Sequence, residues 1–279
     1  MARISVRQRS AHSWIRRLRY WTSRIHGARL QKSQRVYFVT IEGRCFKRLI
    51  EPDSYTAACI AGNLTRFGET DRLPGLVTEY EREVWVDFLP GHALGRIDEK
   101  LARQVADFFA VLYAREARLL PSVATPFPAR LRRNLRFLGG VGVLDAAFRA
   151  DLEEAAERLV PDELWVGFDY TDAVRKNFIA AADDGRICAI DVESLASDEL
   201  IGVGFAKAAE RWLGSHRGDF LDQLQRPGVP DFRPYLPFVE LYFLAHWMQR
   251  AFLERKWRFV GAERFERFRG ANSSELERA

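Results

Sequence analysis

Apolar and β-branched residues alternate with polar ones in two neighbouring segments in the first fifth of the chain. These segments are Val36–Ile41 and Arg44–Ile50, and a two-residue Glu-Gly connection joins them. A short connection with glycine between two such runs is typical of a β-hairpin. A second pair of runs, Leu76–Tyr80 and Glu83–Leu89, is joined in the same way by Glu-Arg. The pattern therefore predicts a β-rich start.

Helical spacing, with apolar residues three and four positions apart, follows in longer segments. Tyr55–Phe67 lies between the two hairpins, and Asp98–Leu120 and Asp145–Leu159 come after them. Tyr235–Ala251 is the most apolar stretch, but charged residues interrupt it, so we expect a buried helix and not a membrane span. Strands followed by helices predict an α+β fold with two lobes, a small β-rich N-lobe and a larger, mainly helical C-lobe.

The same pattern divides the chain into four stretches. Residues 31–90 are the predicted N-lobe and residues 91–270 the predicted C-lobe, with a Pro-Gly pair at the boundary. A basic arm, residues 1–30, precedes the N-lobe. A polar tail, residues 271–279, is expected to be flexible because chain ends with few apolar residues are rarely held down.

Positive charge is concentrated in the arm and just after it. Of the 43 Lys and Arg residues, ten lie within residues 1–41, which hold no Asp or Glu, although the net charge of the chain is only +5. Trp14, Leu18, Trp21 and Ile25 recur among them at helical spacing. This predicts a basic amphipathic helix, which suits peripheral contact with an anionic membrane.

Other interpretations of the arm stay open. Its apolar stripe can pack on the N-lobe while the arginines face water, and an Arg-rich start without acidic residues is also typical of organelle transit peptides. A nucleic-acid arm is disfavoured because no base-reading module follows, so we expect no nucleic-acid partner. No apolar run in residues 1–30 is long enough for a secretory signal.

Cysteine and histidine positions disfavour several kinds of site. Cys45, Cys59 and Cys188 lie far apart, and no pair of cysteines or histidines has metal-ligand spacing. We therefore expect neither a disulfide framework nor a zinc site, and a cytoplasmic location fits best. The sequence also lacks a Gly-x-Ser-x-Gly elbow, a Walker loop and a Gly-x-Gly-x-x-Gly motif, which disfavours hydrolase, P-loop and dinucleotide-binding functions.

The most informative polar residues lie in residues 164–195, next to short apolar runs. Asp172 is followed five residues later by Asn177, and Asp191 ends a run of Cys-Ala-Ile after a predicted hairpin. This order resembles the catalytic loop and metal-binding strand of the protein-kinase-like superfamily, in which Asp-x-x-x-x-Asn is followed by an apolar strand ending in Asp. Lys47, on a predicted strand of the first lobe, matches the family's strand lysine.

The resemblance implies an ATP- and Mg²⁺-dependent phosphotransferase. Asp172 would accept the proton of the attacking hydroxyl, and Lys176 would meet the transferred phosphate. Three further groups of residues are implied: Asn177, Asp191 and Glu193 for the metal; Lys47, Lys32 and Ser33 for the nucleotide phosphates; and Asp87 and Leu89, in the run before the Pro-Gly boundary, for the adenine.

Departures from the family pattern narrow the class of molecule that would accept the phosphate. Tyr170 stands where the family usually has His, Asp191 is followed by Val-Glu instead of Phe-Gly, and Tyr55–Phe67 contains no Glu to pair with the strand lysine. Only about eight residues separate Asp191 from the next predicted helix near Leu200, too few for the activation loop of a regulated protein kinase.

A small-molecule or glycan acceptor is therefore favoured. The Asp-x-Glu ending at residues 191–193 resembles lipopolysaccharide-core sugar kinases, so we expect phosphorylation of a sugar hydroxyl on lipopolysaccharide or another lipid-linked glycan, at the inner membrane. An aminoglycoside-type phosphotransferase is one alternative. A catalytically inactive kinase-like binding protein is another.

Overall fold

The computed structural model describes residues 4–8, 35–68 and 70–273 of the chain. The predicted amphipathic helix around Trp14–Ile25 and most of the polar tail lie outside these residues. Contacts divide the chain into two compact units. Unit 1 consists of Met1–Arg96 and Arg175–Ala196, and unit 2 of Ile97–Val174 and Ser197–Ala279. Residues 175–196, which include Asn177 and Asp191, thus belong with the β-rich part of the chain.

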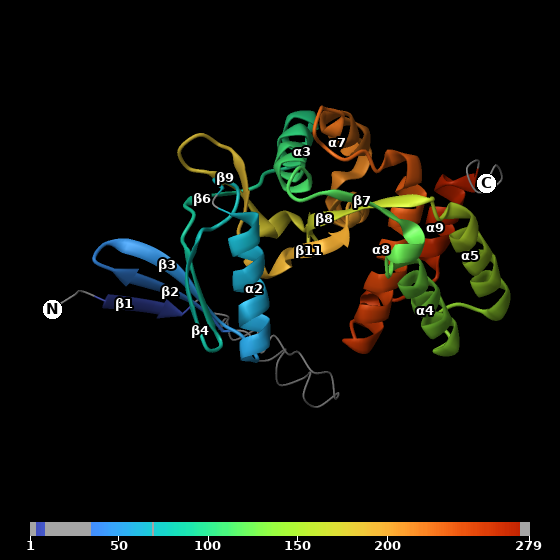
Figure 1. The fold of residues 1–279 in the computed structure, drawn as a ribbon, viewed down its shortest axis with the longest axis horizontal. Helices are drawn as coiled ribbons and strands as arrows, with labels where there is room; N and C mark the ends of the chain where they lie inside the picture. Colours follow the sequence, from blue (N-terminus) through green and yellow to red (C-terminus); the bar gives the residue numbers. More distant parts are fainter. Residues whose placement is uncertain (1–3, 9–34, 69, 274–279) are drawn as a thin grey trace. The chain divides into compact units, whose positions relative to one another are not determined.

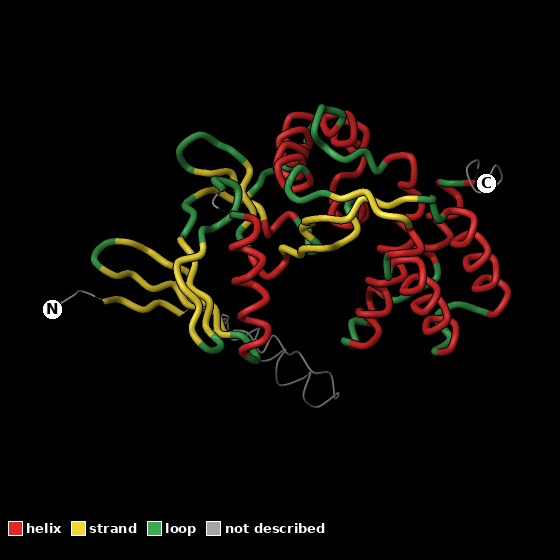
Figure 2. Tube along the Cα trace, in the orientation of Figure 1, coloured by secondary structure: helices red, strands yellow, loops and turns green. Residues whose placement is uncertain are grey.

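An antiparallel sheet of five strands forms the body of unit 1 (Figures 1 and 2). Both predicted hairpins are confirmed, and Glu42 and Gly43, with φ of 50° and 86°, make the first turn through the left-handed region. An edge strand that the sequence pattern did not predict pairs with the first hairpin. In sheet order the strands are β1 (Ile4–Gln8), β2 (Arg35–Ile41), β3 (Arg44–Ile50), β5 (Glu83–Asp87) and β4 (Leu76–Tyr80).

One helix, α2 (Ser54–Phe67), packs on this sheet, as the sequence predicts. Asp53 caps its start, because the carboxylate accepts the Thr56 N–H at 2.7 Å. Its buried side chains recur at helical spacing and are Ala57, Ile60, Ala61, Leu64 and Phe67. A smaller sheet of unit 1 contains β10 (Ile187–Ala189), β9 (Phe178–Ala181) and β6 (Gly91–Ala93), in that order.

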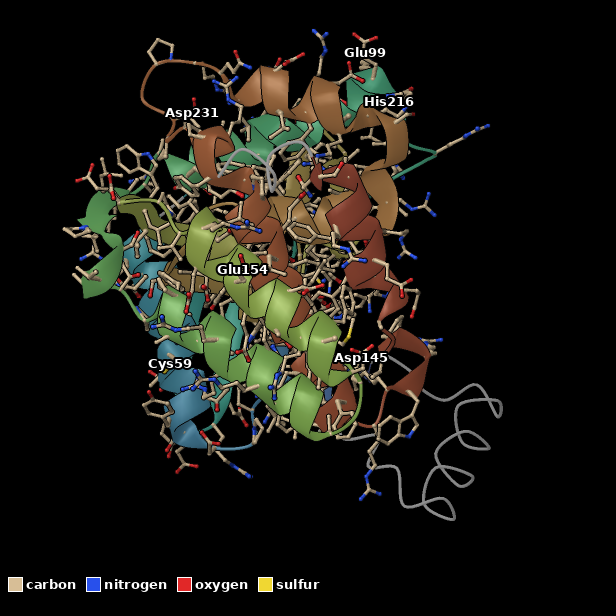
Figure 3. All side chains as sticks on the ribbon, turned by 90° about the vertical axis from the view of Figure 1, so that its right-hand side faces the viewer. Cys59, Glu99, Asp145, Glu154, His216 and Asp231 are labelled. Carbon is tan, nitrogen blue, oxygen red and sulfur yellow. The ribbon has the colours of Figure 1, made fainter. Side chains whose placement is uncertain are left out.

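Unit 2 is mainly helical, in agreement with the predicted α+β class (Figure 2). The predicted helix Asp145–Leu159 is confirmed as α5 (Ala146–Leu159); Asp145 caps its start, and Glu154 projects from its exposed side (Figure 3). The remaining helices of this unit are α3 (Glu99–Tyr113), α4 (Phe127–Gly140), α6 (Val203–Ala208), α7 (Arg217–Leu224), α8 (Leu236–Leu253) and α9 (Glu263–Ala271).

Unit 2 differs from the sequence-based expectations at two places. The helix predicted to reach Leu120 ends at Tyr113, because Glu116 adopts a left-handed φ of 50° and the chain then pairs as a strand. Helix α4 was not predicted, since arginines break up its apolar pattern. The strand that follows Glu116 belongs to a three-stranded sheet. In sheet order its strands are β11 (Leu195–Leu200), β8 (Glu163–Tyr170) and β7 (Arg118–Pro121). Residues 197–200 of β11 belong to unit 2.

Helix α8 forms much of the core of unit 2. Eleven of its residues are buried, which confirms the prediction of a buried helix for this stretch. Phe127 and Phe137 of α4 pack edge-to-face against Tyr242 and Phe252 of α8, with ring centroids 5.6 Å apart in both pairs. Within the described residues, no helix has the combined length and apolarity needed to cross a membrane.

Candidate functional site

In unit 1, a buried lysine reaches the strand that carries Asp191. Lys47 lies in the middle of β3, opposite Phe38 of β2 and Val86 of β5, and only 8% of it is exposed. Its Nζ donates a hydrogen bond of 2.7 Å to the carbonyl oxygen of Ile190, just past the end of β10. A buried ammonium requires such partners. Lys47 is therefore held directly beside the backbone of Asp191.

The hairpin of β9 and β10 brings Asn177 and Asp191 together. Ala189 pairs with Phe178, so Asn177 and Ile190 are opposite each other one position further, where the Ile190 N–H donates to the Asn177 carbonyl oxygen at 2.9 Å. The side-chain amide of Asn177 donates to Oδ2 of Asp191 at 3.3 Å, and Ser194 Oγ donates to the same oxygen at 3.2 Å. These contacts hold a carboxylate and an amide side by side.

This pair has the chemistry that magnesium prefers. Carboxylate and amide oxygens are hard ligands, and Mg²⁺ is usually bound by one or two carboxylates together with substrate phosphates. Glu193, the third expected ligand, lies half-buried two residues beyond Asp191, in a 3₁₀ turn at Val192–Ser194. Asn177 and Asp191 therefore fit a metal site that a nucleotide completes.

Helix α2 contributes an amide where the family pattern has a glutamate. Asn63 Nδ2 donates a hydrogen bond of 3.0 Å to the carbonyl oxygen of Leu195, which lies just after the Asp191 segment. The connection between α2 and β4 adds two further links, because the Ala189 N–H donates to the Arg72 carbonyl at 2.9 Å and Arg72 Nη1 donates to the Ile187 carbonyl at 3.2 Å. Asn63 thus holds the segment after Asp191, and Arg72 holds the strand before it.

In unit 2, a fully buried carboxylate anchors the segment before Asp172. Asp169 is 0% exposed and accepts the N–H groups of Tyr170 at 2.6 Å and of Gly202 and Gly204 at 3.0 Å. Burial raises the pKa of Asp169 to about 7, although these backbone donors oppose the rise. Asp169 is the penultimate residue of strand β8, and its carboxylate accepts backbone N–H groups at the start of α6.

Gly204 permits this arrangement. A Cβ atom there would lie only 2.6 Å from the Tyr170 carbonyl oxygen and 2.7 Å from the Phe109 ring, so α6 can approach β8 only without a side chain at this position. The close approach places the backbone donors of α6 on Asp169. It also brings the rest of α6 close to the residues that follow β8.

Lys207 and Trp212 contact Asp172 and Ala173, which follow β8. Lys207 Nζ, on α6, lies 3.4 Å from Oδ1 of Asp172, and Trp212 Nε1 donates to the Ala173 carbonyl oxygen at 2.8 Å. Residues 209–213 form a π-helical turn, in which positions five apart share a face. Trp212 lies in this turn, whereas Lys207 lies in α6 directly before it, and the two side chains engage adjacent residues of the loop. π-turns of this kind occur often at functional sites.

The sequence reasoning missed Lys207. Only 8% of it is exposed, and its ammonium lies over the rings of Trp247 and Phe243 of α8, 5.0 Å and 5.7 Å from their centroids. Burial lowers its pKa, and the charge of Asp172 opposes this shift. The available signal was a single lysine inside the apolar run Leu200–Ala209, where an unpaired charge would be costly.

The other expected site residues lie in unit 1 or outside the described residues. Lys176 is exposed, in a 3₁₀ turn directly before Asn177. Strand β5 ends at Asp87 and not at Leu89 as predicted; the Asp87 N–H donates to the Gly75 carbonyl oxygen at 2.9 Å, and Leu89 is half-buried. Lys32 and Ser33 fall in the part of the chain that the structure does not describe.

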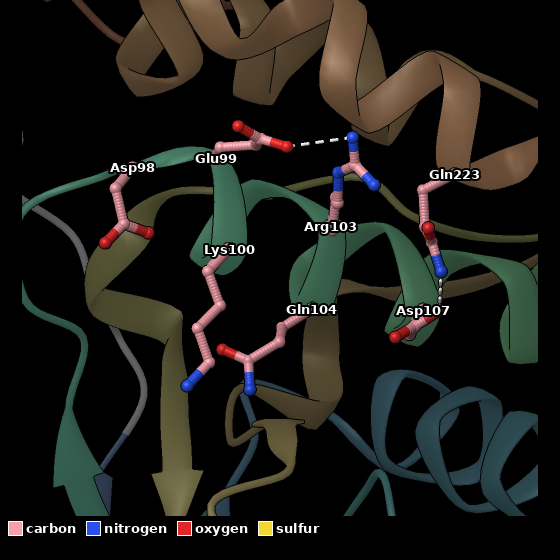
Figure 4. A pocket seen from close by; sticks show the side chains of 7 residues that line it. All are labelled: Asp98, Glu99, Lys100, Arg103, Gln104, Asp107 and Gln223. Atoms are coloured by element: carbon pink, nitrogen blue, oxygen red, sulfur yellow. Dashed lines mark hydrogen bonds and ion pairs between the residues drawn. The ribbon is translucent and has the colours of Figure 1, made fainter.

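A polar hollow on α3 carries none of these residues (Figure 4). Its side chains are engaged with one another: Arg103 pairs with Glu99 at 2.9 Å, and Gln223 donates to Asp107 at 2.8 Å. It offers neither a carboxylate next to a buried cation nor a backbone donor cluster, so it is not our candidate site. The residues that line it are Asp98, Glu99, Lys100, Arg103, Gln104, Asp107 and Gln223.

The fold is shared with solved phosphotransferases. The macrolide 2′-phosphotransferase of Brachybacterium faecium matches with a TM-score of 0.62 at 12% identity, over 86% of this chain and 93% of that one. The choline kinase of Streptococcus pneumoniae matches with a TM-score of 0.60 at 11% identity, over 94% of this chain and all of that one. The chain has the protein-kinase-like fold.

A third solved structure covers almost the whole chain. It is an aminoglycoside phosphotransferase in a ternary complex with ADP and hygromycin B, with a TM-score of 0.55 at 12% identity over 98% of this chain and 93% of that one. No family model and no curated protein matches the sequence. The kinase-like fold is thus evident from the structure at an identity where the sequence comparisons find nothing.

Tyr170 lies in the core of unit 2. It is fully buried and packs edge-to-face on Phe108 of α3, with ring centroids 5.7 Å apart. A tyrosine at the position where the family usually has His therefore serves the core of unit 2. Asp172, two residues later, is half-buried and faces the ammonium of Lys207.

Proposed function

We propose that this chain is an ATP-dependent phosphotransferase that phosphorylates a hydroxyl of a sugar, on lipopolysaccharide or another lipid-linked glycan. One observation carries the proposal: Lys47 and Asn177, 130 positions apart in the sequence, both bond to the two-residue segment Ile190–Asp191. A buried ammonium beside a carboxylate and an amide is the set that nucleotide phosphates with magnesium require. The kinase-like fold supports the same assignment.

Unit 1 supplies the residues for the nucleotide. Lys47 carries a positive charge that would neutralise the α- and β-phosphates, and its bond to the Ile190 carbonyl pre-orients it at low entropic cost. Asn177 and Asp191, with Glu193 nearby, would hold Mg²⁺ against the phosphates. When bound, this metal would neutralise charge on the phosphate oxygens. Asp87 and Leu89 remain our candidates for adenine contact, and Lys32, Ser33 and Lys176 for phosphate contact.

Unit 2 supplies the residue for the acceptor. The Asp172 carboxylate would take the proton of the acceptor hydroxyl, and the ion pair with Lys207 fixes its orientation. In the transfer the hydroxyl oxygen bonds to the γ-phosphorus, the bond from that phosphorus to the β–γ bridging oxygen breaks, and ADP leaves with the electron pair. Positioning and charge neutralisation are sufficient chemistry for such a step.

The glycan acceptor is supported by two features of the sequence. The segment Asp191–Glu193 resembles the Asp-x-Glu ending of lipopolysaccharide-core sugar kinases, and the basic aromatic arm suits the anionic surface on which lipid-linked sugars are assembled. An aminoglycoside-type phosphotransferase is the second candidate, because one of the solved structures with this fold contains hygromycin B.

ADP formation tests the proposal. Wild-type protein with MgATP and membrane glycolipid extract should release ADP, and Asp172→Asn should reduce the rate by a factor of about 100 or more, as expected for loss of a general base. Arg118→Gln, an exposed change on β7 of the same unit, is the matched control and should retain the wild-type rate. Equal, background-level rates for wild type and Asp172→Asn would instead indicate a kinase-like binding protein.

A further inference from the structure

Beside Asp172, two aromatic rings form a binding site for a cation, and the protein's own Lys207 occupies this site. The ammonium of Lys207 lies 5.0 Å from the ring centroid of Trp247 and 5.7 Å from that of Phe243. Aromatic faces at this distance bind ammonium groups, and they are also what an ammonium-bearing substrate would need. Lys207 is almost fully buried there, so an external cation would have to displace it.

A second cation extends the same surface. Arg211, one turn after Lys207, is exposed, and its guanidinium lies 5.7 Å from the centroid of Trp247 and 4.8 Å from that of Phe259. Arg250, on α8, carries a further positive charge, and the charges of Arg211 and Arg250 add to the effect of burial in lowering the pKa of Lys207. Lys207, Arg211 and Arg264 therefore all lie over the ring of Trp247, with Arg264 4.8 Å from its centroid.

The carboxylates on the same elements are engaged elsewhere. Glu210 pairs with Arg264 and, at 3.6 Å, with Arg267, and Glu254 pairs with Arg250 at 3.4 Å. An ammonium-bearing acceptor would therefore be repelled by positive charge, and the aromatic rings that could bind it are already occupied by Lys207. An anionic acceptor could instead bind to two basic side chains, Lys207 and Arg211.

We propose that the acceptor carries a negatively charged group, a phosphate or a carboxylate, which Lys207 and Arg211 bind while Asp172 accepts the proton of a hydroxyl on the same molecule. This rests on the proposed phosphotransferase function and names its substrate class. Lys207 then has two roles, since it positions the Asp172 carboxylate and contributes to the anion site. Arg211 selects the acceptor from the solvent side. The geometry disfavours choline-like and aminoglycoside-like acceptors for this chain.

A series of sugars with one ring and three charges tests the proposal. Glucose 6-phosphate, glucose and glucosamine are titrated into the full chain in the presence of Mg²⁺ and a non-hydrolysable ATP analogue, and binding is measured by calorimetry. We expect glucose 6-phosphate to bind about ten times more tightly than the other two, which corresponds to ~1.4 kcal/mol. Tighter or equal binding of glucosamine, or no preference for the anion, would overturn the proposal.

Two variants separate the anion site from a purely structural role. Arg211→Gln should weaken glucose 6-phosphate binding by about tenfold and leave glucose binding unchanged; Lys207→Gln should weaken glucose 6-phosphate binding at least as much, because Lys207 also positions Asp172. Arg211→Gln keeps the test sound if Lys207→Gln disturbs folding, because Arg211 is exposed. Arg103→Gln, which changes an exposed arginine of α3, is the control and should match wild type. Undiminished anion binding to both Lys207→Gln and Arg211→Gln would contradict the proposal.

Failure of the phosphotransferase function would look different. It would appear as equal, background-level ADP release by wild type and Asp172→Asn, or as absence of Mg²⁺-dependent ATP binding by the wild-type chain, measured in the same calorimeter without any sugar. The anion preference concerns residues of unit 2, whereas the ATP measurement concerns Lys47, Asn177 and Asp191 of unit 1. The two outcomes are therefore read from independent titrations.

Discussion

The ammonium of Lys47 donates a hydrogen bond of 2.7 Å to the carbonyl oxygen of Ile190, the residue directly before Asp191. This bond links the middle of a strand in the five-stranded sheet to the end of a strand in the smaller sheet of the same unit. It fixes a positive charge next to the residue expected to hold the metal. The bond thus positions Lys47 relative to the backbone next to Asp191, the two residues that we propose bind the nucleotide phosphates and the metal.

Replacing Lys47 should weaken nucleotide binding. Lys47→Met keeps the length of the side chain but removes the charge, and we expect a loss of ~2 kcal/mol in ATP binding, about 30-fold in the dissociation constant. Titration calorimetry with MgATP measures it. Arg44→Gln, on the same strand but with an exposed side chain, is the control. Equal ATP affinity in wild type and Lys47→Met would contradict a phosphate-binding role.

Removing a metal ligand should change the magnesium requirement. Asp191→Asn replaces a carboxylate by an amide, and we expect the Mg²⁺ concentration for half-maximal ATP binding to rise about tenfold or more. ATP binding is measured over a magnesium series, with EDTA as the end point. Asp184→Asn lies in the turn of the same hairpin and should leave the series unchanged. A shift of the same size in Asp184→Asn would show that the hairpin as a whole, and not the ligand, is responsible.

Loss of the Asp169 carboxylate should destabilise unit 2. Asp169→Ala leaves the buried N–H groups of Tyr170, Gly202 and Gly204 without their acceptor, at a cost of ~1–3 kcal/mol each. We expect the free energy of unfolding to fall by about 3 kcal/mol or more, measured by urea denaturation. Asp169→Asn retains one acceptor oxygen and should lose less. A change below about 1 kcal/mol in Asp169→Ala would refute the anchoring role.

The same carboxylate should make stability depend on pH. The pKa of Asp169 is raised to about 7 in the folded protein, above the ordinary value near 3.8. Its contribution to stability is therefore complete below pH 4 and is lost as the pH rises through 7. Asp169→Asn cannot titrate, so its stability relative to wild type should increase between pH 4 and pH 7. A difference between the two proteins that stays constant with pH would contradict this titration.

Titration of His246 should change the stability with pH in the direction opposite to that of Asp169. It stacks on Tyr242 with ring centroids 6.1 Å apart, and burial, together with the charges of Arg250, Arg130 and Arg133, lowers its pKa to about 4. Its contribution to stability is present above the ordinary value of 6.5 and is lost as the pH falls through 4. His246→Phe keeps the stacking and cannot be charged. We expect it to gain roughly 3 kcal/mol relative to wild type between pH 6.5 and pH 4.

Denaturation of His246→Phe and wild type at several pH values checks this. Because Asp169 acts with the opposite sign in the same range, the difference in stability between the two proteins, and not the pH dependence of the wild type alone, isolates the histidine. His216→Gln provides a control, since His216 lies near the surface and pairs with Asp219 at 3.0 Å. A gain in the control equal to that of His246→Phe would contradict the effect of burial.

Much of the local structure follows from the sequence pattern. The hairpins around Glu42 and Glu81, helix α2 and helix α5 have the turn residues, caps and apolar spacing that specify them. The pattern failed at Glu116, where pairing of β7 with β8 ended a helix early, and at α4, whose arginines conceal its buried face. Tertiary pairing overrides local propensity in such places.

By itself, the sequence determined the kinds of residue at the candidate site and their order, namely Lys47, Asp172, Asn177 and Asp191. Only the tertiary structure decided their partners. Lys47 meets Ile190 across 143 positions, and the cation beside Asp172 is Lys207, on a helix that follows the whole catalytic segment. Spacing along a chain predicts neighbours within one helix or hairpin, but partners far apart in sequence are set by how sheets and helices pack, because burial, not proximity along the chain, selects them.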